Sequence, residues 1–269
     1  MKLLTIVTMM LALLLSACAT TGNPQDPLEP MNRKVFAFND AVDTYAFKPV
    51  AKGYAAVTPM PVRTGIGNFF SNLEDAWIGT NNLLQGKPGA AASDVGRLLV
   101  NTTVGILGLF DVATELGLEK HDEDLGQTLG VWGVGPGPYL VLPFFGSSTL
   151  RDSSNTLVTL AVPYVDPVGA VDRVAIRNTA RAIRLVDLRA QLLAAGNALD
   201  EAALDKYSFM RDFYLKRRIN QIYDGNPPKV KNKEDDDYLD EPAPPAAPAA
   251  TKLEEPPAGQ FAPAESSGK

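Results

Sequence analysis

The sequence predicts an all-α fold that is interrupted by one irregular segment rich in glycine and proline. Apolar residues recur at helical spacing through most of the chain. No strand-like alternation of four or more residues occurs outside residues 126–146, and this segment carries too many glycines and prolines for a long helix. The body is therefore predicted to be mainly helical, with one irregular insertion.

The first helix is predicted from three start signals at the proper offsets. Asp26 serves as N-cap, Pro27 occupies the first turn, and the Glu29 carboxylate reaches back to the cap. Apolar residues then repeat at helical spacing until Pro49, where the helix is expected to end.

Later helices are predicted from amphipathic stripes that end at glycine or proline. They are expected over 61–86, from a Ser93 cap through 102, over 175–195 with Gly196 as the stop, and over 199–223. Residues 104–110 are apolar almost all round, which predicts a core helix or one lying in the membrane plane. Irregular apolar backbone in 126–146 is expected to be buried or to line a cavity. For 150–162 the pattern leaves helix and strand open.

The N-terminus is typical of a bacterial lipoprotein signal. Lys2 precedes an apolar run from Leu3 to Leu15, and Leu15-Ser16-Ala17-Cys18 places small residues before the only cysteine. The apolar run is too short for a spanning helix. We predict a signal peptide over 1–17, a lipidated linker over 18–25, and a diacylglycerol and an N-acyl chain on Cys18 as membrane anchor.

The C-terminal part from 225 to 269 differs in composition from the body. It holds nine prolines, an acidic run at 234–237 and few large apolar residues, so it is predicted to be a disordered tail. The body from 26 to 224 is predicted to be the folded domain. Residues 18–224 contain 19 basic and 22 acidic side chains, and this near balance argues against a nucleic-acid partner.

The chain has few of the residues that catalysis or metal binding commonly uses. With one cysteine and one histidine, a Cys/His dyad and a zinc cluster are excluded, and no phosphate loop or dinucleotide fingerprint occurs. The chain is therefore expected to be neither an enzyme nor a metal or cofactor protein. His121 lies in a charged cluster, for which a solvated loop is favoured over a cation site.

The apolar helix faces allow two interpretations. Either they form the core of a soluble periplasmic body that the lipid only tethers, or some of them lie in the bilayer while polar faces surround a passage.

Motifs along the body carry a family resemblance that bears on this choice. They are 26–33 with Phe36 and Phe38-Asn39, 68–73, 82–87, 101–105, 110–113, 124–130, 135–139, 142–143 and 148–152. The chain closely resembles the MlaA (VacJ) lipoproteins of Gram-negative bacteria from the lipobox to about Tyr223, and the acidic tail lies outside the resemblance.

The resemblance implies a ring-like helical body embedded in the inner leaflet of the outer membrane. It also implies a function without catalysis: removal of mislocalised phospholipids from the outer leaflet through an amphipathic channel, which maintains lipid asymmetry. The implied partners are phospholipid, a trimeric porin and a soluble periplasmic lipid carrier. Ala19 after the lipidated cysteine is consistent, by the same analogy, with sorting to the outer membrane.

Two groups of residues are candidates for contact with the lipid. Channel lining or gating is predicted for Asn32, Phe38, Asn39, Asp43, Gly133, Gly135, Pro136, Gly137 and Pro138; for the asparagines, capping or a satisfied buried amide is the alternative. Arg173, Arg177, Arg181 and Arg184 share one helix face and are candidates for phosphate headgroups. For them, the alternative is a solvated face paired with Asp172 or Asp187.

Two other functional classes remain open. A structural envelope or porin-accessory lipoprotein with no transport role is consistent with a sequence that lacks catalytic motifs. A lipid hydrolase would use Ser147-Ser148 and Asp152, but no base is apparent in the sequence.

Overall fold

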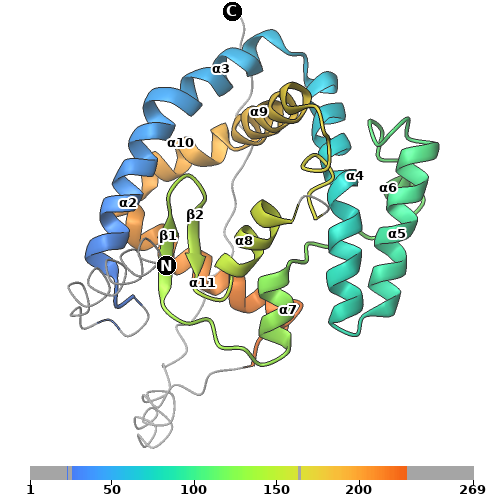
Figure 1. Ribbon diagram of the computed structural model, residues 1–269. Coiled ribbons are helices and arrows are strands. Elements are labelled where there is room, and N and C mark those ends of the chain that lie inside the picture. The colour runs from blue at the N-terminus through green and yellow to red at the C-terminus, as the bar shows by residue number, and fades with distance from the viewer. Residues whose placement is uncertain (1–22, 24–25, 163–164, 229–269) are drawn as a thin grey trace, which may run out of the picture. The chain divides into compact units, whose positions relative to one another are not determined.

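The computed structural model describes residue 23 and residues 26–162 and 165–228, which belong to one compact unit ending at Pro228. The predicted signal peptide, Cys18 and the tail beyond residue 228 lie outside the described residues. Helices dominate this unit, and one hairpin interrupts them (Figure 1). In chain order the elements are α2 (Glu29–Val42), η1 (Asp43–Phe47), α3 (Lys48–Val57), α4 (Met60–Leu84), α5 (Pro88–Thr103), α6 (Val112–Glu115), α7 (Leu125–Val131), β1 (Tyr139–Leu142), β2 (Gly146–Thr149), α8 (Ser153–Ala161), α9 (Val174–Gln191), α10 (Leu193–Ala202) and α11 (Lys206–Ile222).

The first helix runs on past the proline that was expected to end it. The turn before Pro49 is the π-helix η1, and Pro49 then occupies the first turn of α3. Proline lacks an N–H and its ring crowds the carbonyl four residues before, so the wider turn lets the chain continue without that hydrogen bond. Asp26 is also not the cap: α2 begins at Glu29 behind Leu28, and Asp26 is buried in a contact with α11.

Helices α4 and α5 form a hairpin with a polar interface, and they lie side by side in Figure 1. The turn between them needs Gly86, whose φ of +76° is in the left-handed region. Asn82 donates to Asp94 at 2.7 Å, and Asn72 donates to Thr102 at 2.9 Å. The prediction for α4 is confirmed to within two residues. Ser93, in contrast, lies inside α5 and does not cap it, because Pro88 already starts the helix.

Residues 104–110, the α5–α6 loop, are neither a core helix nor a helix in the membrane plane. The loop is a series of turns in which Ile106 and Leu107 have positive φ, a conformation that no helix contains. Asn101 and Asp111 at its two ends are joined by a hydrogen bond of 3.0 Å, and Arg97 binds both oxygens of Asp111. The hydrogen bonds among Arg97, Asn101 and Asp111 therefore fix the ends of an exposed apolar loop.

The glycine- and proline-rich segment forms α7 and then the β1–β2 hairpin. The two strands pair in antiparallel register, from Tyr139 with Thr149 to Leu142 with Gly146. The hairpin is anchored to α2: Asn32 donates to the Tyr139 carbonyl and accepts from the Val141 amide, both at 2.9 Å. The irregular backbone was expected to be buried or to line a cavity, and the first alternative is wrong for 131–137, where every residue is exposed.

The C-terminal helices differ from the prediction mainly at their boundaries. Residues 153–161 are helical, which settles the open alternative for this segment. Helix α9 ends at Gln191, and Gly196 lies inside α10 instead of stopping α9. A glycine inside a helix costs only about 1 kcal/mol, which packing readily offsets. The helix predicted over 199–223 is divided: residues 199–202 belong to α10, and α11 begins at Lys206, where Asp205 caps it by accepting from two backbone amides.

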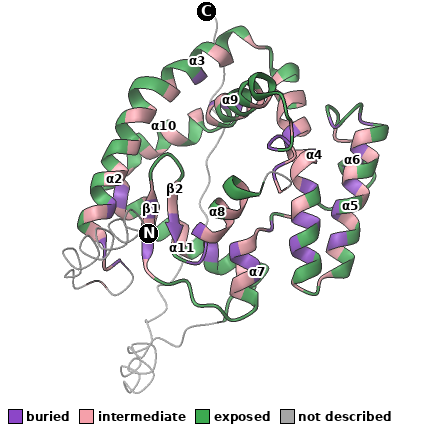
Figure 2. Cartoon of the chain, viewed as in Figure 1, coloured by how far each residue is buried: buried purple, intermediate pink, exposed green. Residues whose placement is uncertain are grey.

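Many polar side chains of this body are buried and many apolar ones are exposed, which reverses the usual distribution. Figure 2 shows where the buried and exposed residues lie along the helices. Among the described residues, 20 polar or charged residues are buried against 11 apolar ones, while 36 large apolar side chains are exposed. The main apolar cluster is small and contains Tyr139, Val141 and Tyr207. In the described part of the chain, none of the helices combines the length and the hydropathy that a membrane-spanning helix requires. Exposed apolar surface on this scale indicates an apolar environment or partner.

Candidate functional site

Three cavities with partly polar walls lie between the helices and share lining residues. The Trp77 cavity, lined by α4, the 122–124 loop, α8, residues 165–168 and α9, has a volume of about 280 Å³. The Tyr214 cavity, between the hairpin, α8 and α11, has about 220 Å³, and the Leu188 cavity, between α2, η1, the hairpin turn and α9, has about 260 Å³. Each is somewhat smaller than a typical small-molecule site, which has a volume of about 300–1,000 Å³.

The shared residues show that the three cavities adjoin one another in a series. Asp122, Asp124 and Asn155 line both the Trp77 cavity and the Tyr214 cavity. Phe145, in the hairpin turn, lines both the Tyr214 cavity and the Leu188 cavity. These residues lie between neighbouring cavities and border both.

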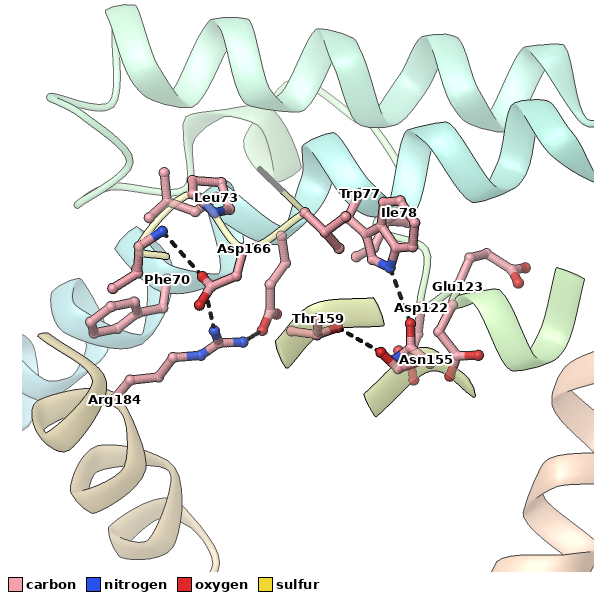
Figure 3. Close-up of a pocket in the computed structure, with 15 residues that line it drawn as sticks. Phe70, Leu73, Trp77, Ile78, Asp122, Glu123, Asn155, Thr159, Asp166 and Arg184 are labelled. Carbon is pink, nitrogen blue, oxygen red and sulfur yellow. Dashed lines mark hydrogen bonds and ion pairs between the residues drawn. The ribbon is translucent and has the colours of Figure 1, made fainter. Parts of the chain in front are cut away.

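The two ends of the Trp77 cavity differ in chemistry (Figure 3). Arg184 and Asp166 lie at one end with Phe70, and Trp77 and Asn155 lie at the other. Arg184 pairs with Glu74 on α4 and lies 4.0 Å from Asp166, while the Trp77 indole N–H donates to Asn155 at 3.2 Å. The cavity thus presents one cation, several carboxylates and an apolar wall.

The Tyr214 cavity is built around a buried ion-pair cluster. Arg218 on α11 donates to both oxygens of Asp124 at 2.7 and 2.6 Å and lies 3.1 Å from Asp152. Burial alone would raise the pKa of Asp152, but Arg218, Arg151 and the Tyr214 hydroxyl outweigh it, so the pKa lies below its usual value. The carboxylate therefore stays charged inside the protein, next to the cavity.

The Leu188 cavity has apolar walls and two charged groups. Arg189 on α9 donates to both oxygens of Asp43 in η1, at 2.6 and 2.7 Å. Asn39 on α2 donates to the Leu142 carbonyl and accepts from the Phe144 amide, both at 2.9 Å. Phe38 meets the Phe144 ring edge to face at 5.3 Å. These contacts tie the hairpin turn to α2 directly beside the cavity.

The predicted channel residues are only partly brought together. Asn39 and Asp43 line the Leu188 cavity. Asn32 is fully buried, and its bonds to Asp26, Tyr139 and Val141 make it a satisfied buried amide that fixes the hairpin. The glycines and prolines of 133–138 line none of the three cavities. That any of these residues lines or gates a passage stays a prediction.

The predicted headgroup arginines divide into two groups. Arg181 and Arg184 pair with Asp166 and Glu74, and only Arg184 lines a cavity. Arg173 and Arg177 have no ion pair among the described residues. The alternative pairing with Asp187 is wrong, because Asp187 accepts from Tyr54 and Gln191 instead.

Several lining residues could not be identified from the sequence. Trp77 and Asn155 lie 78 positions apart, and Arg218 joins the cluster from the last helix. Each looks like an ordinary member of an amphipathic helix. The sequence offers one related signal, the polar face of α4: Asn72, Asp75 and Asn82 recur on the side opposite the apolar stripe, and all three are buried.

The histidine has a partner within the protein. His121 Nδ1 lies 2.9 Å from Asp94 Oδ1 on α5. Among the described residues no group of three or more histidine, cysteine or acidic side chains is arranged to hold a metal ion.

A helical body with a polar interior, an apolar exterior and a series of cavities is a fold suited to an amphiphile. Comparison with known proteins identifies its family. Residues 24–221 match the MlaA lipoprotein family, so the chain belongs to that family.

Named relatives cover most of the chain. The intermembrane phospholipid transport system lipoprotein MlaA of Escherichia coli is 35% identical over 216 residues, which is 76% of this chain and 82% of the relative. The protein of the same name from Haemophilus influenzae is 31% identical over 90% of this chain and 99% of the relative. An uncharacterized protein of Rickettsia prowazekii is 43% identical over 134 residues, and the chain spans about half of its length (53%).

A solved structure has the same fold. It is described as the "Structural basis for maintenance of bacterial outer membrane lipid asymmetry", with a TM-score of 0.63 and 34% identity. The match covers 75% of this chain and 99% of the solved one.

Proposed function

We propose that this chain is an outer-membrane lipoprotein that removes mislocalised phospholipids from the outer leaflet and passes them to a soluble periplasmic carrier. The observation that carries the proposal is the series of three adjoining cavities inside a body with many exposed apolar side chains. Relatives named as intermembrane phospholipid transport lipoproteins support the same conclusion.

The physics of lipid movement explains why such a body needs no catalytic group. A phospholipid headgroup that enters an apolar layer loses its hydration, which costs several kcal/mol. Ion pairs and amides along the three cavities replace part of that hydration, and the apolar walls accept the acyl chains. Arg184 in the Trp77 cavity is the candidate contact for the phosphate among the four predicted arginines.

The anchor and partners belong to the same proposal. Acyl chains on Cys18 would hold the body at the periplasmic face of the outer membrane, after removal of the signal peptide, and two or three chains give stable anchoring. A trimeric porin and the periplasmic carrier are the proposed protein partners. The exposed apolar surface supports contact with lipid or porin, since each offers an apolar environment.

A cell-based experiment tests transport itself. Surface-exposed phospholipid would be measured in cells lacking the gene and in cells carrying the wild-type chain, Thr156→Trp or Leu157→Trp. Thr156 lines the Tyr214 cavity, whereas Leu157, the next residue of α8, is exposed. We expect Thr156→Trp to raise surface phospholipid as deletion does, and Leu157→Trp to behave as wild type, at equal amounts of membrane-bound protein.

The same experiment separates transport from the alternative, a structural or porin-accessory lipoprotein. A scaffold would tolerate a filled cavity, so normal surface phospholipid with Thr156→Trp would refute the passage. A Cys18→Ala variant tests the anchor, because loss of the acyl chains should release the chain from the outer membrane and mimic deletion.

A further inference from the structure

A fourth cavity lies apart from the series of three. The Arg63 cavity, between the first half of α4 and the end of α9, has a volume of about 510 Å³. Its lining includes Arg63, Thr64, Asn68, Ser71 and Gln191, and it shares no lining residue with the other three cavities. Its size is within the range of small-molecule sites.

Arg63 has no carboxylate partner within ion-pair distance among the residues that the structure describes. Its guanidinium has one hydrogen bond, from Nη2 to the Met60 sulfur at 3.4 Å, and its Nε is buried without a partner. Asp187, one turn before Gln191, accepts instead from Tyr54 and Gln191 at 2.8 Å. An arginine that is partly buried and lacks a counter-ion is unusual, since its desolvation is normally offset by an anion.

The other groups around the cavity suit an anion with several oxygens. Thr64 and Ser71 offer hydroxyls, and Asn68 and Gln191 offer amides. Lys120 donates to the Ser71 carbonyl, but its charge is paired with Asp75, so Arg63 is the cation that the cavity itself offers to an anion. Guanidinium binds phosphate oxygens with two parallel hydrogen bonds, which makes phosphate the best fit to this donor set.

The surface next to the cavity is apolar and indicates which phosphate compound would bind. Asn68, which lines the cavity, also donates to the Leu109 carbonyl of the α5–α6 loop at 3.2 Å. Ile106 and Leu107 in that loop are 58% and 63% exposed. A phosphate site beside an exposed apolar loop matches an amphiphile, whereas a free phosphate would leave the loop uncovered.

We propose that the Arg63 cavity binds the phosphate group of a phospholipid whose acyl chains lie along the α5–α6 loop. The site would hold a lipid beside this exposed apolar loop, outside the series of three cavities. The inference rests on the proposed function only in that both involve phospholipid.

The experiment places a photo-crosslinking side chain in each region. Thr64→p-benzoylphenylalanine reports on the Arg63 cavity, and Thr156→p-benzoylphenylalanine reports on the Tyr214 cavity. The full-length chain would be irradiated in cells and purified, and the mass of the adduct would be read on the intact protein. A diacyl phospholipid and a small soluble phosphate ester differ clearly in that mass.

The variants are Arg63→Met, Arg63→Lys and the control Lys52→Met. Lys52 is an exposed cation on α3 without an ion pair among the described residues. We expect a diacyl phospholipid adduct at Thr64, reduced roughly tenfold or more by Arg63→Met, as the loss of a charged hydrogen-bond donor predicts. Arg63→Lys should give an intermediate yield, and Lys52→Met the wild-type yield. An unchanged Thr156 adduct in Arg63→Met would show that the body is folded.

Three outcomes would overturn the site. They are an adduct at Thr156 with none at Thr64, a Thr64 adduct that Arg63→Met and Arg63→Lys leave unchanged, and a Thr64 adduct with the mass of a soluble phosphate ester. If neither reporter gives a lipid adduct, the proposed function fails together with this site.

Discussion

Replacing Asn39 with alanine should loosen the hairpin turn without unfolding the body. The substitution removes two hydrogen bonds of 2.9 Å, one to the Leu142 carbonyl and one from the Phe144 amide. Each contributes roughly 0.5–1.5 kcal/mol, so the turn should open more easily by about 1–3 kcal/mol. Because about 1.4 kcal/mol corresponds to a factor of ten, the open population should rise roughly 5- to 150-fold.

Hydrogen exchange measured by mass spectrometry on peptides covering 140–148 would test this expectation. Asn68→Ala is the matched control, because Asn68 donates to the Leu109 carbonyl and touches a different loop. It should leave exchange over 140–148 unchanged and accelerate exchange in the α5–α6 loop. Less than a twofold change with Asn39→Ala would refute the conclusion that Asn39 holds the turn closed beside the Leu188 cavity.

Three further predictions concern stability. Arg218→Met should lower the free energy of unfolding by about 3–5 kcal/mol, because two carboxylates lose their buried partner. The control Arg217→Met removes an exposed ion pair and should cost less than about 1 kcal/mol, with both values measured by denaturant titration. Burial alone would raise the pKa of Asp111, but hydrogen bonds from Thr114, Asn101 and Arg97 lower it to about 2. The charged carboxylate therefore adds stability that is complete above about pH 4 and is lost as the pH falls through about 2. Asp111→Asn should remove this pH-dependent loss of stability from an acid titration of the free energy of unfolding. Gly108→Ala should cost about 2–4 kcal/mol, since φ is +86° and the new Cβ would lie 2.7 Å from α4, whereas Gly117→Ala at φ +80° meets no atom within 4 Å and should cost about 1–2 kcal/mol in thermal unfolding.

Helix positions were predicted well where a single stripe carries the signal. The helix expected over 61–86 is α4, which spans 60–84. The errors at Pro49 and Gly196 have a common cause, because each residue disfavours a helix locally but does not end it here. The π-helical turn η1 accommodates Pro49, and packing offsets the cost of Gly196 inside α10.

Which face of each helix is buried was harder to predict than where the helices lie in the sequence. In α4 the residues buried against α5 and α7 include Asn72, Asp75 and Asn82, while apolar residues such as Val62 and Leu83 are exposed. An apolar stripe shows that one face differs from the other, but the stripe does not say whether protein or lipid covers it.

The candidate site was predicted only where its residues are close in sequence. Asn39 and Asp43, one turn apart, do line one cavity, and Arg184 lines another. Trp77, Asn155 and Arg218 come from three separate helices, and only the folded chain brings them to adjoining cavities. No local pattern marks such residues.

The interior made of amides and ion pairs has a thermodynamic consequence. The heat capacity of unfolding rises with newly hydrated apolar area and falls with newly hydrated polar area. Here few large apolar groups would be newly hydrated, and in a detergent micelle many of them would stay covered in the unfolded chain as well. The heat-capacity increment per residue should therefore be well below the roughly 12–15 cal/mol/K of ordinary globular proteins. Stability would then change only gently with temperature, and a lipid-handling protein built this way would work over a wide thermal range.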